Sequence, residues 1–161
     1  MYLLLIRHGI AAPLGGKIVR DEDRPLTAQG RKRFHQVASA LVRLAPCPRA
    51  ILTSPLLRAR QTAEIAAQAW GHLRPKLVPA LATGDPRGIR RALAGFVDED
   101  TVVLVGHEDW LSQYTARLLG SRSSRGFRYR KGGATFLEVA RGRAAGGTLL
   151  WFLPPRVFRG V

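Results

Sequence analysis

The sequence predicts an α/β domain of three layers with a mostly parallel central sheet. Apolar runs of strand length alternate with segments of helical periodicity, in the order β-α-β-α, which is typical of such sheets. No internal repeat or low-complexity linker interrupts the 161 residues, of which 46% are hydrophobic. That length supports one packed core, so we expect a single domain over residues 1–161.

Five apolar runs predict the strands. The runs at 2–6, 50–53 and 101–106 are continuous, as expected for parallel strands that are buried on both faces. Two later runs, 134–140 and 148–153, form a pair separated by a glycine-rich connection. The first three are therefore expected to be covered on both faces.

The first helix has readable ends and a readable core face. Thr27 is a suitable N-cap, and Pro46 stops the helix. The i, i+3, i+4, i+7, i+8 spacing of a core-facing stripe is met by Phe34, Val37, Ala38, Leu41 and Val42. We therefore expect this helix to cover one face of the sheet.

The sequence predicts three further helices from the residues at their N-termini. In the second, Ser54 can serve as the cap and Pro55 as the first helical residue, so that a strand leads directly into a helix. The third begins at Asp85 by the same signals. The fourth follows His107 and ends near Gly120.

Composition limits the compartment and excludes a membrane protein. The longest apolar opening is far shorter than the roughly 20 residues that cross a bilayer, and no signal-peptide pattern surrounds it. Cys47, the one cysteine, gives neither an internal disulfide nor a zinc spacing, which fits a reducing compartment. We expect a cytoplasmic protein without a membrane segment.

The net charge of +15 favours an anionic partner. Of the 26 basic residues, 22 are arginine, whose planar fork suits phosphate and carboxylate. The alternative is that the arginines are spread over a solvated surface.

Polar residues follow three of the predicted strands at the point where each strand ends. These segments are Arg7-His8-Gly9, Ser54 to Arg58, and Gly106-His107-Glu108. Ligands of open α/β sheets bind outside the carboxyl ends of the strands, where helix N-termini also attract anions. The sequence therefore predicts a phosphoryl-binding site at this edge.

Four segments in this order, LIRHG, RPLTAQG, SPLLRARQTA and VVLVGHE, resemble the histidine phosphatase superfamily, related to phosphoglycerate mutase. The short length and the segment KGGATFLEV are most similar to the small phosphohistidine phosphatases of the SixA type. The resemblance covers nearly the whole chain and implies a phosphoglycerate mutase-like fold.

The resemblance also implies roles for individual residues. His8 would be the nucleophile and form a phosphohistidine intermediate that water hydrolyses. Arg7 and Arg58 would hold the equatorial oxygens, and a protonated His107 would add a third positive group. Gly9 would let the substrate approach the backbone, and a neighbouring carbonyl could fix the His8 tautomer.

Other residues are weaker candidates. Arg60 lies two positions from Arg58 on a helix and points to the opposite face, so only Arg58 can reach the site. Arg24 is expected in a surface ion pair. The four histidines show no metal-ligand spacing, so we expect neither a metal nor a cofactor.

The general acid of the wider family has no evident counterpart. Asp85 is available but is expected to cap a helix, and Glu108, assigned here to substrate binding, is the alternative acid. A phosphate ester expels an alkoxide, which needs a proton, whereas phosphohistidine expels an imidazole, a better leaving group. The sequence thus favours a phosphorylated protein as substrate, with small phosphate compounds as the alternative.

The basic segment 121–131 raises a different function. It interleaves arginines with Phe127 and Tyr129, as nucleic-acid-binding loops do. No other part of the chain matches a nucleic-acid module, so we expect instead a solvated loop, or one that borders the site and selects an acidic protein partner.

Overall fold

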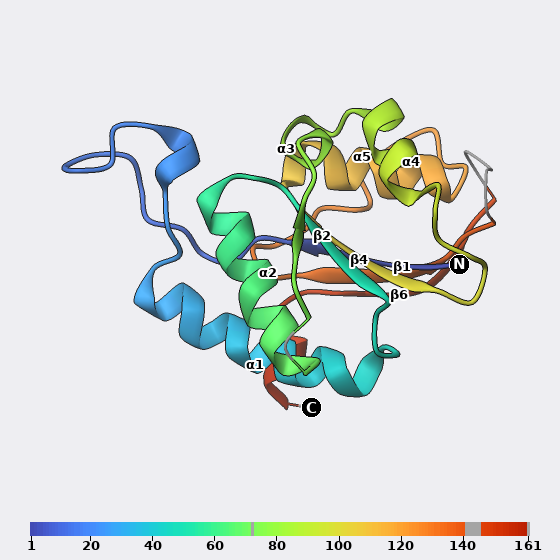
Figure 1. The fold of residues 1–161 in the computed structure, drawn as a ribbon, viewed down its shortest axis with the longest axis horizontal. Helices are drawn as coiled ribbons and strands as arrows, with labels where there is room; N and C mark the ends of the chain where they lie inside the picture. Colours follow the sequence, from blue (N-terminus) through green and yellow to red (C-terminus); the bar gives the residue numbers. More distant parts are fainter. Residues whose placement is uncertain (72, 141–145, 161) are drawn as a thin grey trace.

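The computed structural model describes residues 1–71, 73–140 and 146–160, which form one sheet flanked by helices (Figure 1). The strands are β1 Tyr2–Arg7, β2 Ala50–Thr53, β3 Lys76–Leu77, β4 Thr101–Gly106, β5 Ala134–Glu138 and β6 Thr148–Leu153. The α-helices are α1 Ala28–Leu44, α2 Leu57–Ala69, α3 Ala80–Thr83, α4 Pro86–Leu93 and α5 Glu108–Leu118. Two 3₁₀ turns are η1 Asp21–Asp23 and η2 Val157–Gly160.

The sheet has the strand order β3-β2-β4-β1-β5-β6. Strands β1, β2, β3 and β4 pair in parallel, while β5 and β6 pair antiparallel at one side. The predicted fold class, a mostly parallel sheet between helical layers, is therefore confirmed.

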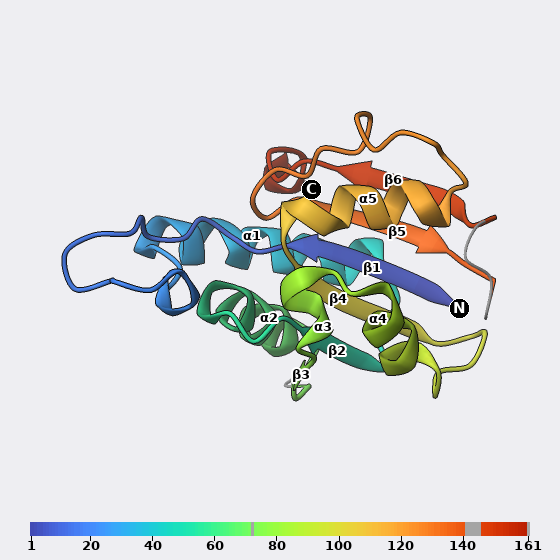
Figure 2. The same cartoon turned by 90° about the horizontal axis from the view of Figure 1, so that it is seen from above.

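Helices cover both faces of the sheet (Figures 1 and 2). Along β1, Leu4 and Ile6 join the core under α1 and α2, whereas Leu3 and Leu5 join the core under α4 and α5. Successive side chains of a strand point to opposite faces, so a strand buried on both faces must be apolar throughout. This is why the opening run has no polar residue until Arg7.

Helix α1 begins as its cap predicts. The Thr27 side chain accepts a hydrogen bond from the Gly30 amide at 2.9 Å, and Phe34 and Leu41 are buried. The assignment of Val42 to the core stripe is wrong, because its side chain is 40% exposed. Val42 lies at the edge of the buried face, in the last turn of the helix.

Helix α2 begins two residues later than predicted. Its first residue is Leu57, so Pro55 is not helical. The Ser54 hydroxyl accepts a bond from the Leu56 amide at 3.3 Å in the preceding turn instead of capping the helix. The reason is tertiary: the same hydroxyl also contacts His107, which holds Ser54 outside the helix.

The remaining helices match their signals. Asp85 caps α4 by accepting from the amides of Arg87 and Gly88, both at 3.0 Å. Helix α5 follows His107 directly. The short elements β3 and α3, which are two and four residues long, were not predicted from the sequence.

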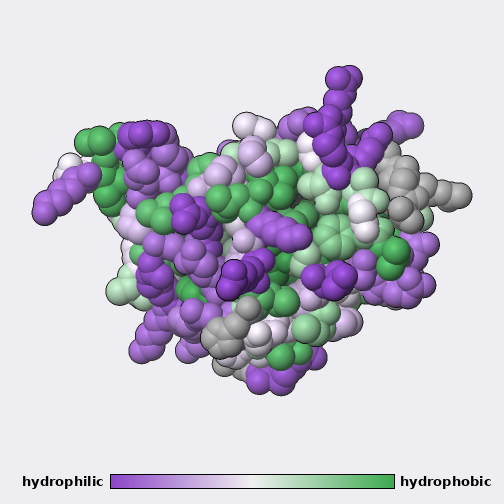
Figure 3. All heavy atoms as spheres, viewed as in Figure 1, coloured by the Kyte–Doolittle hydropathy of each residue, from purple (hydrophilic) through white to green (hydrophobic). Residues whose placement is uncertain are grey.

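The segment between β1 and α1 extends beyond the helical layers (Figures 1 and 2) and exposes Leu14 and Val19. On the face shown in Figure 3, hydrophilic residues are distributed among apolar ones and do not form a single patch. Among the described residues, no helix has the length and apolar character that crossing a membrane requires.

Candidate active site

The register between β1 and β4 brings the two histidines together. Arg7 pairs with Gly106, so the next residues along both strands, His8 and His107, leave the sheet side by side. The His8 amide donates to the Gly106 carbonyl at 3.0 Å, which continues the pairing by one residue. The imidazole ring centres lie 5.2 Å apart, and both side chains are buried.

The tautomer of His8 is fixed by its own loop. Nδ1 of His8 lies 2.7 Å from the Gly9 carbonyl oxygen, which can only accept a hydrogen bond. Nδ1 therefore carries the proton, and the lone pair is on Nε2. The Gly9 amide in turn donates to Thr62 Oγ1 at 3.0 Å, which ties this loop to α2.

Burial keeps both imidazoles neutral. Desolvation is the largest cause that lowers the pKa of His8 to about 3. The hydrogen bond to Gly9 raises this pKa, whereas the nearby charges of His107, Arg58 and Arg7 lower it. Burial and then Arg58 lower the pKa of His107 to about 4. At neutral pH, His107 carries a charge only when a bound anion raises its pKa.

Arg7 lies between the loop before β5 and the start of α5. Its Nη1 donates to the Tyr129 carbonyl at 2.5 Å and lies 3.6 Å from Oε2 of Glu108. Within the described structure its Nε is buried without a hydrogen-bond partner, as is Oε2 of Glu108. The Glu108 carboxylate is held from its other side by the Ser112 hydroxyl at 2.7 Å.

Arg58 enters the site from the first turn of α2. It is buried, and its Nη1 and Nη2 donate to the carbonyl and the Oδ2 of Asp21 at 2.7 and 2.8 Å. Arg24 donates to the other carboxylate oxygen of Asp21 at 2.8 Å, so the predicted ion pair of Arg24 exists. Both arginines lower the pKa of Asp21, Arg24 most strongly.

The structure separates the weaker candidates from this group. Arg60 is exposed, as expected for the opposite side of α2. Asp85 is used as the cap of α4. Glu108 lies beside Arg7, but its assignment to substrate binding stays a prediction, as does the approach of substrate to Gly9.

Two supporting residues of the site were not predicted from the sequence. Ser54 is fully buried, with its Oγ 2.8 Å from Nε2 of His107. Asp21 orients Arg58 from a turn 37 positions away along the chain. Their positions depend on contacts that are distant in sequence, so a local pattern could not reveal them.

Both aromatic residues of segment 121–131 pack against other parts of the chain, and Phe127 is partly exposed. Tyr129 is buried and shares a hydrogen bond of 2.7 Å with Thr115, and burial raises its pKa. Phe127 packs near Phe152, with ring centres 6.3 Å apart. The segment instead borders the site, because the Tyr129 carbonyl holds Arg7.

A metal site has no support in the part of the chain that the structure describes. No group of three His, Cys, Asp or Glu side chains there could hold an ion. The positive groups at this edge are protein side chains, so the arrangement can bind a phosphoryl anion and present the Nε2 lone pair of His8 to phosphorus.

Comparison with known proteins identifies the family. The model of the histidine phosphatase superfamily (branch 1) matches residues 3–84. An uncharacterized protein of Picosynechococcus sp. is 36% identical over 149 residues, which cover 89% of this chain and 88% of the relative.

Solved structures share the fold. The protein histidine phosphatase SixA complexed with tungstate has a TM-score of 0.84 at 23% identity, over 98% of this chain and 99% of its own. The alpha-ribazole phosphatase from Shigella flexneri has a TM-score of 0.73 at 20% identity, over 96% and 97%. The chain therefore belongs to the histidine phosphatase superfamily, as a phosphatase with the phosphoglycerate mutase-like fold of SixA.

Proposed function

We propose that the protein removes the phosphoryl group from phosphohistidine of a protein, through a covalent intermediate on His8. The observation that carries this proposal is the fixed tautomer of His8: its Nδ1 proton is donated to the Gly9 carbonyl, and its low pKa keeps Nε2 unprotonated. A neutral imidazole with a free lone pair is the form that attacks phosphorus.

The reaction then has two displacements. The free ring nitrogen of the substrate phosphohistidine takes a proton from solvent. Nε2 of His8 then forms a bond to phosphorus while the P–N bond of the substrate breaks, and the electron pair leaves with a neutral imidazole. Water next attacks the phosphohistidine, the P–Nε2 bond breaks, and phosphate is released with a proton. Arg7, Arg58 and His107 stabilise the charge on the equatorial oxygens in both transition states.

The choice of phosphohistidine depends on the leaving group. Asp85, one of the two candidate acids, is used to cap α4 by two amides. Imidazole has a conjugate acid with a pKa near ~6.5 and leaves without a strong proton donor, unlike an alkoxide. A site without a side chain committed to general acid catalysis is suited to cleavage of the P–N bond.

One observation favours a second candidate function, hydrolysis of small phosphate esters. Oε2 of Glu108 is buried without a hydrogen-bond partner and lies next to Arg7, where a protonated carboxyl could donate to a leaving oxygen. A structural relative, the alpha-ribazole phosphatase from Shigella flexneri, is named for a small phosphate compound.

A parallel assay in EDTA separates the two functions. The wild type and Glu108→Gln are compared on a phosphohistidine protein, p-nitrophenyl phosphate, a sugar phosphate and phosphoglycerate. We expect the highest kcat/KM on phosphohistidine, with little effect of Glu108→Gln on that substrate. Faster turnover of phosphoglycerate or the sugar phosphate, lost in Glu108→Gln, would establish the ester function instead.

Trapping the intermediate tests the nucleophile. Brief reaction with ³²P-labelled substrate, followed by quenching, should label the wild type in an acid-labile, base-stable manner, as expected of a phosphoryl group on nitrogen. His8→Ala should give neither label nor turnover. A His8→Ala variant that still acquires the label would show that another residue is the nucleophile.

The same proposal includes the substrate class and the compartment of the reaction. The substrate is a phosphorylated protein, with a small phosphate compound as the alternative, and the cytoplasm is its expected compartment. The exposed single Cys47 fits that compartment.

A further inference from the structure

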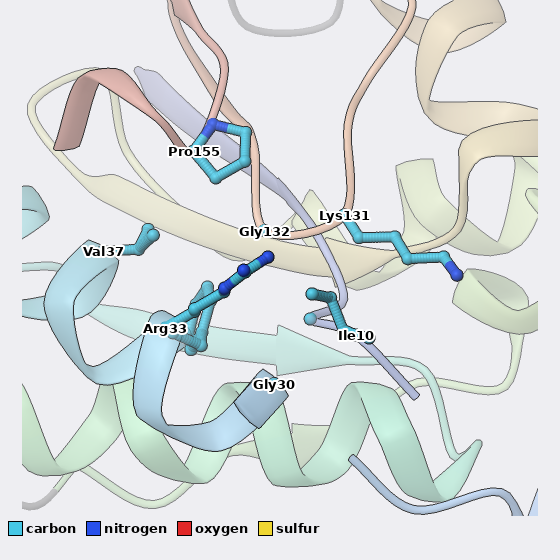
Figure 4. Close-up of a pocket in the computed structure, with 9 residues that line it drawn as sticks. Ile10, Gly30, Arg33, Val37, Lys131, Gly132 and Pro155 are labelled. Atoms are coloured by element: carbon cyan, nitrogen blue, oxygen red, sulfur yellow. The ribbon is translucent and has the colours of Figure 1, made fainter. Parts of the chain in front are cut away.

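A small cleft lies beside the candidate active site, between α1, the loop after β1 and the chain before β5. Its volume is about 50 Å³. Ile10, Phe34, Val37 and Pro155 form apolar walls, while Arg33 and Lys131 are the charged side chains of its lining. We call it the Arg33 cleft (Figure 4).

The Arg33 cleft is attached directly to the nucleophile loop. Gly9, which accepts the Nδ1 hydrogen bond of His8, also lines the cleft. Across the cleft, the Gly132 amide donates to the carbonyls of both Arg7 and His8, each at 3.1 Å. Gly9 and Gly132 therefore connect the cleft to the backbone around His8.

The charge in the cleft is positive and unbalanced. Figure 4 shows the guanidinium of Arg33 reaching toward the middle of the cleft, whereas Lys131 extends away from it on the other side of Ile10. No acidic residue lines the cleft. Among the described residues, no carboxylate forms an ion pair with Arg33 or Lys131.

We propose that the Arg33 cleft binds a glutamate side chain of the phosphorylated protein, near its phosphohistidine. The carboxylate would pair with Arg33, and the methylene stem would lie against Phe34, Val37 and Pro155. One water needs about 10–15 Å³ of such volume, so the cleft accommodates a group of about three to five heavy atoms. This inference rests on the proposed function and names a specificity determinant for it.

The combination of charge and apolar wall selects this ligand. A free phosphate would pair with Arg33 but would leave the apolar walls without a partner, and a leucine side chain would fill the cleft but leave Arg33 unpaired. In a helical substrate, a residue one turn from the phosphohistidine lies about 5–6 Å away, which suits two adjacent sites on one surface.

Phosphohistidine peptides provide the test. All peptides have the same length. Each carries a single Glu at one of the four positions on either side of the phosphohistidine and Gln at the remaining positions, and an all-Gln peptide is the reference. We expect one Glu position to raise kcat/KM of the wild type about fivefold, the range of a partly exposed ion pair. Arg33→Met should lose this preference, and Arg33→Glu should reverse it.

Lys32→Glu is the matched control, because it makes the same charge change on an exposed position of the same helix outside the cleft. It should keep the preference for the Glu peptide. Turnover of p-nitrophenyl phosphate reports whether each variant retains its active site. The readout is the ratio of kcat/KM for the Glu peptide to kcat/KM for the all-Gln peptide within one variant.

Two failures are distinguishable. Equal turnover of every Glu peptide and the all-Gln peptide, or a preference that survives in Arg33→Glu, overturns the Arg33 cleft as a specificity site and leaves the phosphohistidine activity standing. Hydrolysis of p-nitrophenyl phosphate with no hydrolysis of any phosphohistidine peptide overturns the proposed function, and this inference with it.

Discussion

Both terminal nitrogens of Arg58 donate to one residue, Asp21, at 2.7 and 2.8 Å. A guanidinium has five N–H groups in a rigid fork, so this contact occupies one edge and leaves the edge that includes Nε for a ligand. Asp21 is itself held by Arg24, which also donates to the Ala12 carbonyl at 2.6 Å. The segment between β1 and α1 thereby sets the orientation of the buried arginine.

Removal of this contact should weaken phosphoryl binding. We expect Asp21→Ala to lower kcat/KM by about tenfold to a hundredfold, since a small misplacement of a positioned group has effects of this size. The inhibition constant for vanadate, which mimics pentacoordinate phosphorus, should rise in parallel. Asp23→Ala, in the same 3₁₀ turn but paired with Arg20 instead of Arg58, is the control. Higher activity of Asp21→Ala would show that Asp21 competes with the phosphoryl group for Arg58.

Two arginines on one helix should differ sharply. Arg58→Ala should lower kcat by about two to three orders of magnitude, the usual effect of deleting one preorganised donor in the transition state. Arg60→Ala should stay within about twofold of the wild type, because that side chain is exposed. Steady-state kinetics with matched circular dichroism spectra would check this, and a crippled Arg60→Ala would contradict the site.

The lowered histidine pKa values predict the pH profile. An attacking imidazole must be unprotonated, and the pKa of about 3 for His8 keeps it so throughout the range from pH 5 to 8. After correction for the ionisation of the substrate, kcat/KM should show no fall as the pH decreases from about 7.5 to 5. An ordinary histidine would give an acid limb near pH ~6.5. A fall of kcat/KM at that pH would refute the low pKa assigned to His8.

The same pKa values predict the pH dependence of stability. The folded-state pKa of both histidines, about 3 and about 4, lies below the unfolded value, so the unfolded chain binds protons first as the pH falls. The free energy of unfolding should therefore fall as the pH decreases from about 6.5 toward these values. Urea titrations at several pH values should show a shallower fall in His8→Asn, and an unchanged slope would count against a buried neutral His8.

Gly30 should tolerate no side chain. A Cβ there would lie far inside van der Waals contact with the Ile10 carbonyl, a backbone atom of the nucleophile loop. Gly30→Ala should lower stability by about 1–3 kcal/mol and reduce turnover, because the loop also holds the tautomer of His8. Gly95→Ala is the control, since nothing lies within 4 Å of its Cβ position. Thermal melts and kinetics of the two variants would decide this.

Local patterns in the sequence determined most of the fold. The residues of β1, β2 and β4 are mostly apolar because these strands are buried on both faces, and Thr27 and Asp85 cap helices because their side chains satisfy amides only two or three residues away. The same reasoning erred where a distant contact intervened. Ser54 has the right residue type for a cap, but its hydroxyl serves His107 and α2 begins at Leu57.

Sequence motifs also identified the family and predicted four central side chains, because those residues lie at strand and helix ends that can be located by hydrophobic pattern. Their geometry was decided by tertiary structure. The parallel register of β1 and β4 places His8 beside His107, burial lowers both pKa values, and a turn 37 positions from Arg58 provides its partner Asp21. Pairing, desolvation and long-range ion pairs depend on which segments meet in space, and no local pattern of residues contains that information.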